Sequence, residues 1–477
     1  MKHEKLSQAL SELDDKYIAE AVKKKRPVLR WAAPIAAVLA IAILATTLLK
    51  PAIGGIPGAP IDHNIQRNYL VAKPEYPKLT AYPLTEGEGS YDDWWEEQRV
   101  FYRQPEGYAD SLEPFWEKLL SATTTDTKNN AVCSPVNVYM ALAMLAQITD
   151  GNTKQELLDV LNADSMDALA TQAKHVWEGH YKNDGLSTSI LATSLWLEEN
   201  YGFNQETADL LAENFYASVF RGDLGTERMN EVLCAWLDEQ TGGLLEQQLN
   251  SASLPADTVL ALASTIYYKV QWLDEFQEKN NTQATFHGAN GATKETFMNR
   301  TLPYGPYYWS DSFGAIYLPL EDGSRMWLIL PDEGVDPGSI WGEVRALLSQ
   351  DPIYADTTAN SKTMKVHLSV PKFDIHQSQD LSSALQKLGI TEVFTSRSDF
   401  SPILEQPDGG YVSQVNHAAR VAINEKGVTA AAFTDIKRAG AAPPPEEEIY
   451  FTLDRPFLFY IESEDALPLF AGIVNQP

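Results

Sequence analysis

The sequence predicts a large α+β body preceded by a membrane-spanning helix and an extended spacer. Two observations lead to this prediction. Helical and strand patterns alternate from residue 111 to residue 477 without a second linker, and an uncharged apolar run covers residues 31–49. Hydrophobic residues make up 44% of the chain and charged residues 21%. A packed core is therefore expected, and a wholly disordered or collagen-like chain is excluded.

The first 49 residues are expected to form a cytoplasmic tail, 1–27, and a transmembrane signal anchor, 28–49. About 20 apolar residues are needed to cross the hydrocarbon as a helix. The basic run Lys23–Arg26 precedes the apolar run, and basic flanks stay on the cytoplasmic side. The body should then be extracellular. A cleaved signal peptide and a buried core helix are the alternatives; the long leading segment argues against the first, and the basic flank against the second.

Residues 50–110 are expected to be an extracellular tether. Prolines and glycines recur along this segment and disfavour regular structure. Within it, residues 91–103 could instead form a short helix packed on the body, because Trp94 and Trp95 are unusual in a fully solvated spacer. Both interpretations stay open. The simple layout of anchor, tether and body favours a bacterial membrane protein.

Charge and composition exclude several classes of function. The net charge of −28 argues against nucleic acid as a partner, because phosphate contacts need clustered Lys and Arg. Cys133 and Cys234 are the only cysteines, so a disulfide framework or Cys-rich zinc site is excluded, and both are expected to be free thiols. Eight scattered histidines predict no metal site, and no cofactor is expected. No GxSxG, HExxH or phosphate-loop motif indicates an enzyme.

Local patterns define several elements of the body. Ser134 and Pro135 are typical of a helix start, as N-cap and first helical residue. Residues 136–148 are apolar nearly all round, which predicts a central buried helix. Two strands and a short helix are predicted at 325–330, 457–461 and 381–390.

Six segments of the body, taken in order, resemble the serpin family of serine protease inhibitors. They are NAVCSPVNVYMALAMLAQITDGNTKQELLDVL at 130–161, STIYYKVQWLDEF at 264–276, WLILPDEG at 327–334, KVHLSVPKFDI at 365–375, LGITEVFTSRSDFSPI at 388–403 and DRPFLFYI at 454–461. The resemblance covers residues 111–477 and leaves the anchor and tether outside. It implies a serpin fold with three β-sheets, eight or nine helices and an exposed reactive-centre loop between Glu425 and residue 448.

The start of this loop resembles the hinge of inhibitory serpins. A loop that becomes a central strand must alternate between two faces. From residue 427 to residue 434 there is no proline and no charge, so an inserted strand would lose no ladder donor and bury no charge. The hinge residues implied are Glu425, Gly427, Val428, Ala430, Ala431, Ala432 and Thr434. The alternative is an ordinary alanine-rich loop or helix.

The resemblance implies a suicide-type inhibitor with serine proteases as its partners. A protease would attack the loop and form an acyl-enzyme, and insertion of the cleaved loop into the main sheet would then trap it. The inhibitor has no catalytic residues of its own and is expected to be a monomer. The alternative is a non-inhibitory serpin acting as a surface binding protein.

The reactive bond is expected to be Ala441–Ala442. Inhibitory serpins place the residue before the cut sixteen positions after the glutamate of the hinge, here Glu425. The prolines at 443–445 disfavour later bonds. A small side chain at Ala441 suits elastase-like or subtilisin-like proteases, whereas Arg438 is the alternative bait, for trypsin-like ones.

Residues beneath and at the top of the sheet match the family in part. Ser134 and His417 fall where the family places hydrogen-bonding residues under the opening sheet, in the region called the shutter. Trp272 matches a family tryptophan at the top of the sheet, the breach. The family's shutter asparagine is replaced by Ser264, and a second family serine by Asn137, which leaves the usual network in doubt.

Overall fold

The computed structural model describes nine stretches of the chain, which are 63–83, 91–124, 128–243, 253–254, 258–348, 360–406, 411–428, 445 and 447–477. Residues 58–477 form one compact unit. The predicted tail and anchor, 1–27 and 28–49, lie outside the described residues. Within the described stretches, no helix is both long and apolar enough to cross a bilayer.

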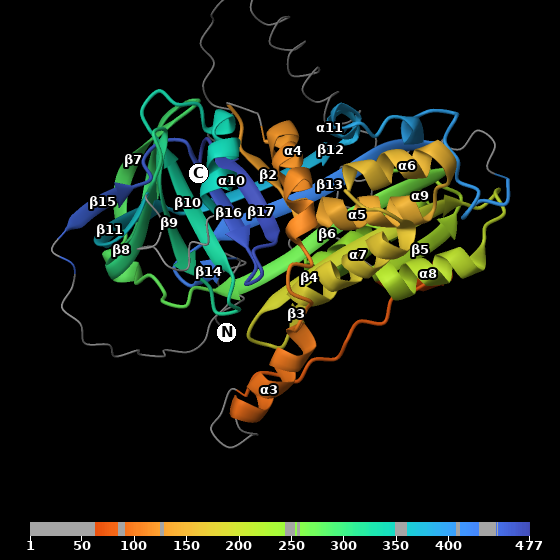
Figure 1. Ribbon diagram of the computed structural model, residues 1–477, viewed down its shortest axis with the longest axis horizontal. Coiled ribbons are helices and arrows are strands. Elements are labelled where there is room, and N and C mark those ends of the chain that lie inside the picture. The colour runs from red at the N-terminus through yellow and green to blue at the C-terminus, as the bar shows by residue number, and fades with distance from the viewer. Residues whose placement is uncertain are drawn as a thin grey trace, which may run out of the picture. The chain divides into compact units, whose positions relative to one another are not determined.

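An eight-stranded sheet, here called the main sheet, runs through the middle of this unit (Figure 1). Its strands, in spatial order, are β1 (Leu70–Ala72), β5 (Ala217–Gly222), β4 (Thr188–Glu198), β6 (Leu260–Gln271), β14 (Gly427–Val428), β13 (Val412–Ile423) and β12 (Phe373–Asp380), with β3 (Lys182–Asn183) paired to β4. Alternate residues of β6, from Leu260 to Val270, face the large hydrophobic core.

The other strands form a nine-stranded sheet. In order they are β15 (Glu448–Thr452), β11 (Ser361–Pro371), β8 (Gly291–Trp309), β9 (Phe313–Pro319), β10 (Arg325–Pro331), β16 (Phe457–Glu462), β17 (Pro468–Val474) and β2 (Ala131–Cys133), with β7 (Thr282–Gly288) paired to β8. The expectation of three sheets is wrong for the described strands, because the 19-residue β8 pairs with both β11 and β9 and joins two sheets into one.

Eight α-helices of the described chain lie between residues 111 and 477. They are α4 (Glu113–Thr123), α5 (Pro135–Gln147), α6 (Gly151–Val160), α7 (Met166–His180), α8 (Gln205–Phe215), α9 (Glu227–Thr241), α10 (Trp341–Leu348) and α11 (Ser382–Leu388). This agrees with the expected eight or nine. α5 contacts β4, β6 and β17 and so lies between the two sheets, whereas α9 packs on β6.

The predicted central helix is confirmed. Every residue of α5 from Pro135 to Ala146 is buried, which its apolar sequence requires. The strands expected at 325–330 and 457–461 correspond to β10 and β16, and the short helix within 381–390 corresponds to α11.

Part of the expected tether is instead packed on the body. Residues 63–82, here called the N-terminal belt, begin with the 3-10 helix η1 (His63–Asn68) and continue through β1. Ile65 is 5% exposed and packs in a cluster with Trp196 and Trp236. β1 pairs with β5 and so extends the edge of the main sheet.

The second half of the belt ends in an aromatic cluster. Tyr76 lies 5.4 Å from Trp177, ring centre to ring centre, and Trp177 stacks on Tyr216 at 3.5 Å. Further on, the backbone N–H of Tyr82 donates to the carbonyl of Asp184. Residues 63–82 are therefore not a free spacer, although the segment contains prolines, because separate apolar side chains pack it on the body.

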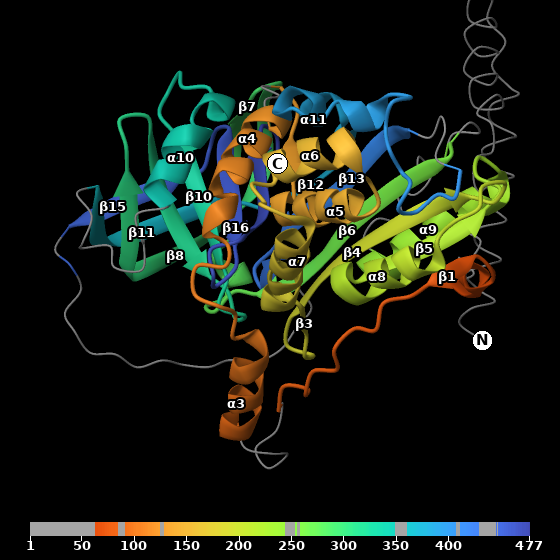
Figure 2. The same cartoon turned by 45° about the vertical axis from the view of Figure 1, so that its right-hand side comes forward.

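The helix considered within the tether is present as α3 (Tyr91–Tyr102). Both ribbon views show it projecting beside β3 (Figure 2). The indole N–H of Trp94 donates to the carbonyl of Thr80, and Lys182 lies over the ring of Tyr102 at 4.0 Å. The helix therefore contacts both the belt and β3.

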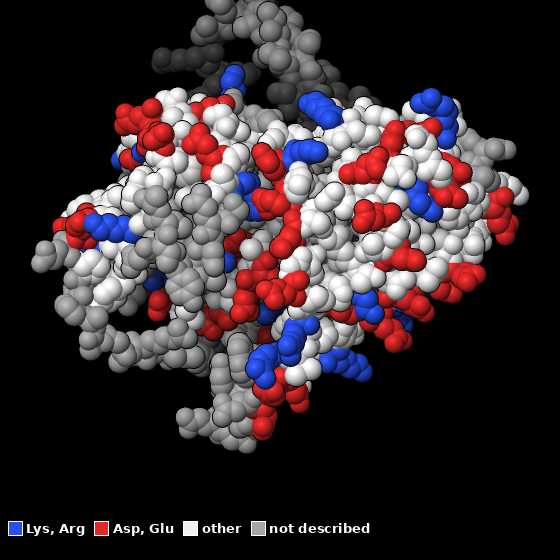
Figure 3. Space-filling view, in the orientation of Figure 1, with Lys and Arg blue, Asp and Glu red and all other residues white. Residues whose placement is uncertain are grey.

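Acidic side chains are spread over the surface. Figure 3 shows them across the visible face, with fewer basic side chains between them. This distribution agrees with the net charge of −28 and offers no continuous basic surface on that face.

Candidate functional site

The beginning of the predicted hinge is already a strand of the main sheet. Gly427 and Val428 form β14, which pairs antiparallel with Gln271 and Val270 of β6 on one side. On the other side, Val428 pairs with Ile423 of β13. Val428 is 1% exposed and belongs to the large core. Two residues of the predicted hinge are thus part of the main sheet in this structure.

Below β14 the two flanking strands are separated. β6 and β13 pair directly, in parallel, only from Val412–Leu260 to His417–Ser264. Among the described residues, no backbone pair joins Thr265–Lys269 of β6 to Ala418–Ala422 of β13. Among the described strands, the sheet is therefore open over five residues between β14 and the Ser264–His417 pair, a stretch here called the gap.

The turn before β14 is fixed by backbone hydrogen bonds from the end of β6. Trp272 donates its backbone N–H to the carbonyl of Lys426 at 2.8 Å and its indole N–H to the carbonyl of Asn424 at 2.9 Å. Phe276 donates its N–H to the carbonyl of Glu425. Trp272 is 1% exposed. The tryptophan expected at the top of the sheet therefore holds the hinge in position.

The side chain of Glu425 is held by two donors. It accepts from Lys372 Nζ at 2.5 Å and from the amide of Asn281. Burial alone would raise the pKa of Glu425, but these two bonds outweigh it and lower the pKa below the ordinary value. The carboxylate is thus charged while the hinge is in place.

Ser134 contacts His417 next to the backbone pair that His417 forms with Ser264. The backbone N–H of Ser134 donates to Nε2 of His417 at 3.0 Å. Burial lowers the pKa of His417 to about 4, so the ring is neutral and its proton is on Nδ1. Ser134 precedes α5 as expected, but its hydroxyl does not cap the helix and has no partner.

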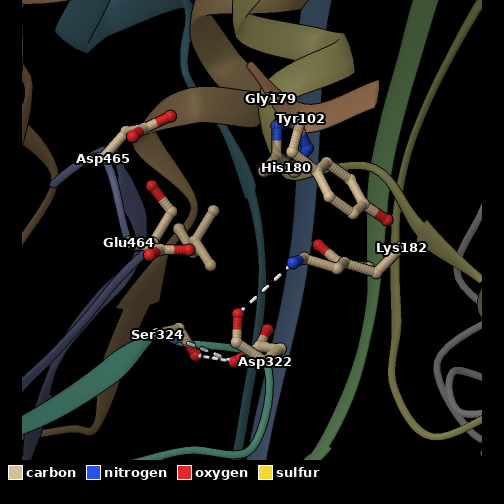
Figure 4. A pocket seen from close by; sticks show the side chains of 11 residues that line it. Tyr102, Gly179, His180, Lys182, Asp322, Ser324, Glu464 and Asp465 are labelled. Carbon is tan, nitrogen blue, oxygen red and sulfur yellow. Dashed lines mark hydrogen bonds between the residues drawn. The ribbon is translucent and has the colours of Figure 1, made fainter. Parts of the chain in front are cut away.

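A small polar pocket lies away from this opening, between α3, the end of α7 and the β16–β17 turn. Figure 4 shows Glu464 and Asp465 across the pocket from Tyr102 and His180. Lys182 Nζ donates to the carbonyl of Asp322 at 3.3 Å. The interior is about 50 Å³, which is enough for one or two water molecules but not for an organic ligand.

Neither cysteine forms a disulfide. Cys133 is on the buried strand β2 and Cys234 is on α9, as expected. Burial raises the pKa of Cys133 to about 12 and that of Cys234 to about 11. Neither thiol is therefore an activated nucleophile.

The structure brings together the described members of the predicted site. Glu425, Gly427, Val428 and Trp272 meet at one end of the gap, and Ser134, Ser264 and His417 at the other. The remaining predicted residues, Ala430, Ala431, Ala432, Thr434, Arg438, Ala441 and Ala442, lie outside the described residues. Sequence reasoning missed Lys372 and Asn281, whose role depends on a contact between distant strands.

Comparison with known proteins agrees with this geometry. The family model described as "Serpin (serine protease inhibitor)" matches residues 113–477. Serine protease inhibitor 42Dd of Drosophila melanogaster is 29% identical, over 74% of this chain and 92% of the relative. The leukocyte elastase inhibitor of Bos taurus is 27% identical, over 75% of this chain and 96% of the relative.

Solved structures show the same fold. The thermophilic serpin tengpin in its native state superposes with a TM-score of 0.68 at 23% identity, covering 79% of this chain and 95% of tengpin. Human thyroxine-binding globulin complexed with thyroxine gives 0.67 at 20% identity, covering 78% and 98%. The chain belongs to the serpin family. This is a family of serine protease inhibitors, and the chain is not an enzyme.

Proposed function

We propose that the protein inhibits serine proteases by a suicide mechanism, in which a cleaved reactive-centre loop inserts into the main sheet. The protease attacks the loop and forms an acyl-enzyme with its catalytic serine. Insertion then carries the attached protease along the sheet and distorts its active site before deacylation. The inhibitor supplies no catalytic group. It supplies the loop that becomes a strand and the position in the main sheet that this strand occupies.

The observation that carries this proposal is the pre-inserted β14 above the gap. If the loop followed Val428 into the sheet, the antiparallel register of β14 would advance by one residue of β6 for each residue of the loop. Six positions beyond Val428, Thr434 would lie opposite Ser264, six positions before Val270. The β13 side agrees, because six positions before Ile423 is His417. Residues 429–433 would thus fill the five-residue gap without breaking any strand pair, and Thr434 would be the first to separate Ser264 from His417.

Insertion would lower the free energy of the cleaved chain. Each new backbone hydrogen bond contributes roughly 1 kcal/mol net. Val428 already faces the core, so positions 430, 432 and 434 would follow on the same face. Ala430 and Ala432 are small enough to pass over the packed core. The uncleaved form is then kinetically trapped rather than at its lowest free energy.

We infer that the reactive bond is Ala441–Ala442 and that the targets are elastase-like or subtilisin-like proteases. The bond lies sixteen residues beyond Glu425, a residue of the turn before β14, and immediately before three prolines. A leukocyte elastase inhibitor among the relatives supports an elastase-like target. Cleavage after Arg438 would leave three fewer residues to insert, so trypsin-like enzymes should mostly treat the protein as a substrate.

The proposed location is the outer face of a bacterial cell membrane. The basis is the apolar run at 28–49 behind the basic residues 23–26. Residues 1–27 would be cytoplasmic, the serpin domain extracellular and the protein a monomer. Protease shaving of intact cells should release a fragment beginning after Lys50, whereas secreted protein beginning near residues 46–50 would indicate a cleaved signal.

Val428→Arg tests the mechanism. An arginine here would place a charge in the core beside Val270, so β14 should leave the sheet and the rest of the loop should not follow it in. Wild type should form a detergent-stable complex with elastase or subtilisin, and the variant should be cleaved without forming one. The matched control is Val100→Arg, at a position 69% exposed on α3. Absence of any stable complex with wild type would favour a non-inhibitory binding protein.

Mass spectrometry of the C-terminal peptide released from an elastase complex tests the bond. A peptide beginning at Ala442 supports the proposal. A peptide beginning at Ala439 would instead assign the bait to Arg438 and the targets to trypsin-like enzymes.

A further inference from the structure

The small polar pocket beside α3 is lined by three buried side-chain atoms that have no hydrogen-bond partner among the described residues. They are Tyr102 Oη of α3, His180 Nε2 at the end of α7 and Ser189 Oγ of β4. His180 is 2% exposed and Ser189 is 1% exposed. Folded proteins leave few buried polar atoms unbonded, so three such atoms around one pocket indicate that the pocket serves a ligand.

The ring of His180 defines what that ligand must offer. Its Nδ1 lies 2.6 Å from the carbonyl oxygen of Val176, and a carbonyl can only accept, so Nδ1 carries the proton. Burial lowers the pKa of His180 to about 4, and the ring is therefore neutral at neutral pH. Nε2 can then only accept, and it needs a ligand that donates a hydrogen.

The other walls of the pocket are polar as well. Lys182 Nζ donates to the carbonyl of Asp322 at 3.3 Å, and Figure 4 shows the carboxylates of Glu464 and Asp465 across the pocket. The positive charge of Lys182 disfavours a metal cation at this point. An interior of about 50 Å³ admits one or two water molecules. Water therefore fits both the volume of the pocket and the donor that the histidine needs.

We propose that the pocket binds water as a structural ligand, which joins Tyr102 of α3 to His180 of α7 and Ser189 of β4. The water donates one hydrogen to the ring of His180 and bonds to the two hydroxyls, each of which can donate or accept. It thereby fastens the C-terminal end of α3 to the body. The site does not depend on the proposed inhibition, because none of the residues that line the pocket lies at the gap in the main sheet.

α3 is suited to such an attachment, because a polar stripe of the helix contacts the body. Trp94, Gln98 and Tyr102 follow one another at four-residue spacing and so lie on one face. The indole N–H of Trp94 and the side-chain amide of Gln98 both donate to the carbonyl of Thr80. Direct hydrogen bonds thus hold the first two positions, and the bound water holds the third. The family model begins at residue 113, so α3 lies outside the matched region.

Ser189→Ala tests the site, because the hydroxyl of Ser189 bonds to no described group of α3. Its loss removes one bond of the water, and hydrogen exchange of the α3 amides should accelerate about fivefold. Tyr102→Phe should accelerate this exchange by a similar factor. The double variant should do little more than either single variant, because both hydroxyls act through the same water.

Two variants provide matched controls. Ser194→Ala removes a hydroxyl on the same strand, β4, that bonds to the carbonyl of Ala263. Tyr450→Phe removes a hydroxyl at a position that is 73% exposed. Neither variant should change hydrogen exchange in α3.

Unchanged or slower exchange of the α3 amides in Ser189→Ala would overturn the inference, because the hydroxyl would then be unbonded. Fully additive effects of the two substitutions would overturn it as well. Slower exchange in ammonium chloride than in sodium chloride at equal ionic strength would assign the pocket to an ammonium ion instead of water. A crystal structure of the protein should show a water molecule about 2.7–3.2 Å from Nε2 of His180, and a dry pocket would contradict the proposal.

Discussion

Lys372 Nζ lies 2.5 Å from a carboxylate oxygen of Glu425 and ties the hinge turn to the start of the neighbouring strand β12. Glu425 is 6% exposed, whereas the side chain of Lys372 is 37% exposed, so only the carboxylate of this ion pair is shielded from water. Together with the two hydrogen bonds from Trp272, it holds the turn before β14 in position.

Removal of this lysine should release the hinge. Lys372→Met leaves a buried carboxylate with Asn281 as its side-chain partner, which should destabilise the intact protein by roughly 2 kcal/mol. Hydrogen exchange of the Gly427 and Val428 amides should accelerate. Lys365→Met, which breaks an exposed ion pair with Glu448, is the control and should leave exchange at the hinge unchanged.

Acid should weaken the protein through two buried histidines. Burial lowers the pKa of His180 and of His417 to about 4. The unfolded chain, with an ordinary histidine pKa near 6.5, therefore takes up protons first. The contribution of these two histidines to the free energy of unfolding is fully present above about pH 6.5. It is lost as the pH drops toward 4, by up to roughly 3 kcal/mol for each histidine.

Urea unfolding at a series of pH values measures this loss. His180→Gln should remove part of the slope between pH 6.5 and 4. The exposed His287→Gln serves as control, and an identical slope in His180→Gln and wild type would contradict the assignment.

The belt should contribute to stability through its anchoring side chains. Ile65→Ala removes a buried side chain from the cluster around Trp196 and Trp236 and should cost about 2–3 kcal/mol. Lys73→Ala, at an exposed position of the same segment, should change the free energy of unfolding by less than about 0.5 kcal/mol. Equal effects from the two variants would mean that the belt does not add to the fold.

Both thiols should resist alkylation in the native protein. The raised pKa values of Cys133 and Cys234, about 12 and 11, leave little thiolate at pH 8. Iodoacetamide should label neither cysteine within the time in which it labels both in urea. Rapid labelling of native Cys133 would show that β2 opens in solution.

The sequence patterns predicted the elements whose periodicity is strong. α5 is apolar on every side, and β10 and β16 are continuous apolar runs, so burial alone dictates their form. The hinge could also be proposed from sequence, because small uncharged residues at alternating positions suit insertion. That Gly427 and Val428 are already inserted could not be predicted, since this depends on how far β6 and β13 separate.

The belt was missed for a related reason. Its anchors, Ile65 and Tyr76, are isolated apolar residues among prolines and polar residues, and they have no helical or strand period. Only the tertiary surfaces of α9 and α7 give them a place to bind. The ion pair of Lys372 with Glu425 was equally hidden, since 53 positions separate the two residues in sequence.

The belt also determines how the protein would respond to mechanical force on its N-terminus. A pull would first act on the contact of η1 with α9 and on the pairing of β1 with β5, which joins two residues of each strand. These contacts can peel away one after another, because Tyr76, farther along the chain, is held separately against Trp177. Strain would be dissipated at the sheet edge before it reached β4 and β6. The separation between β6 and β13 would thus be insulated from a pull on the N-terminus.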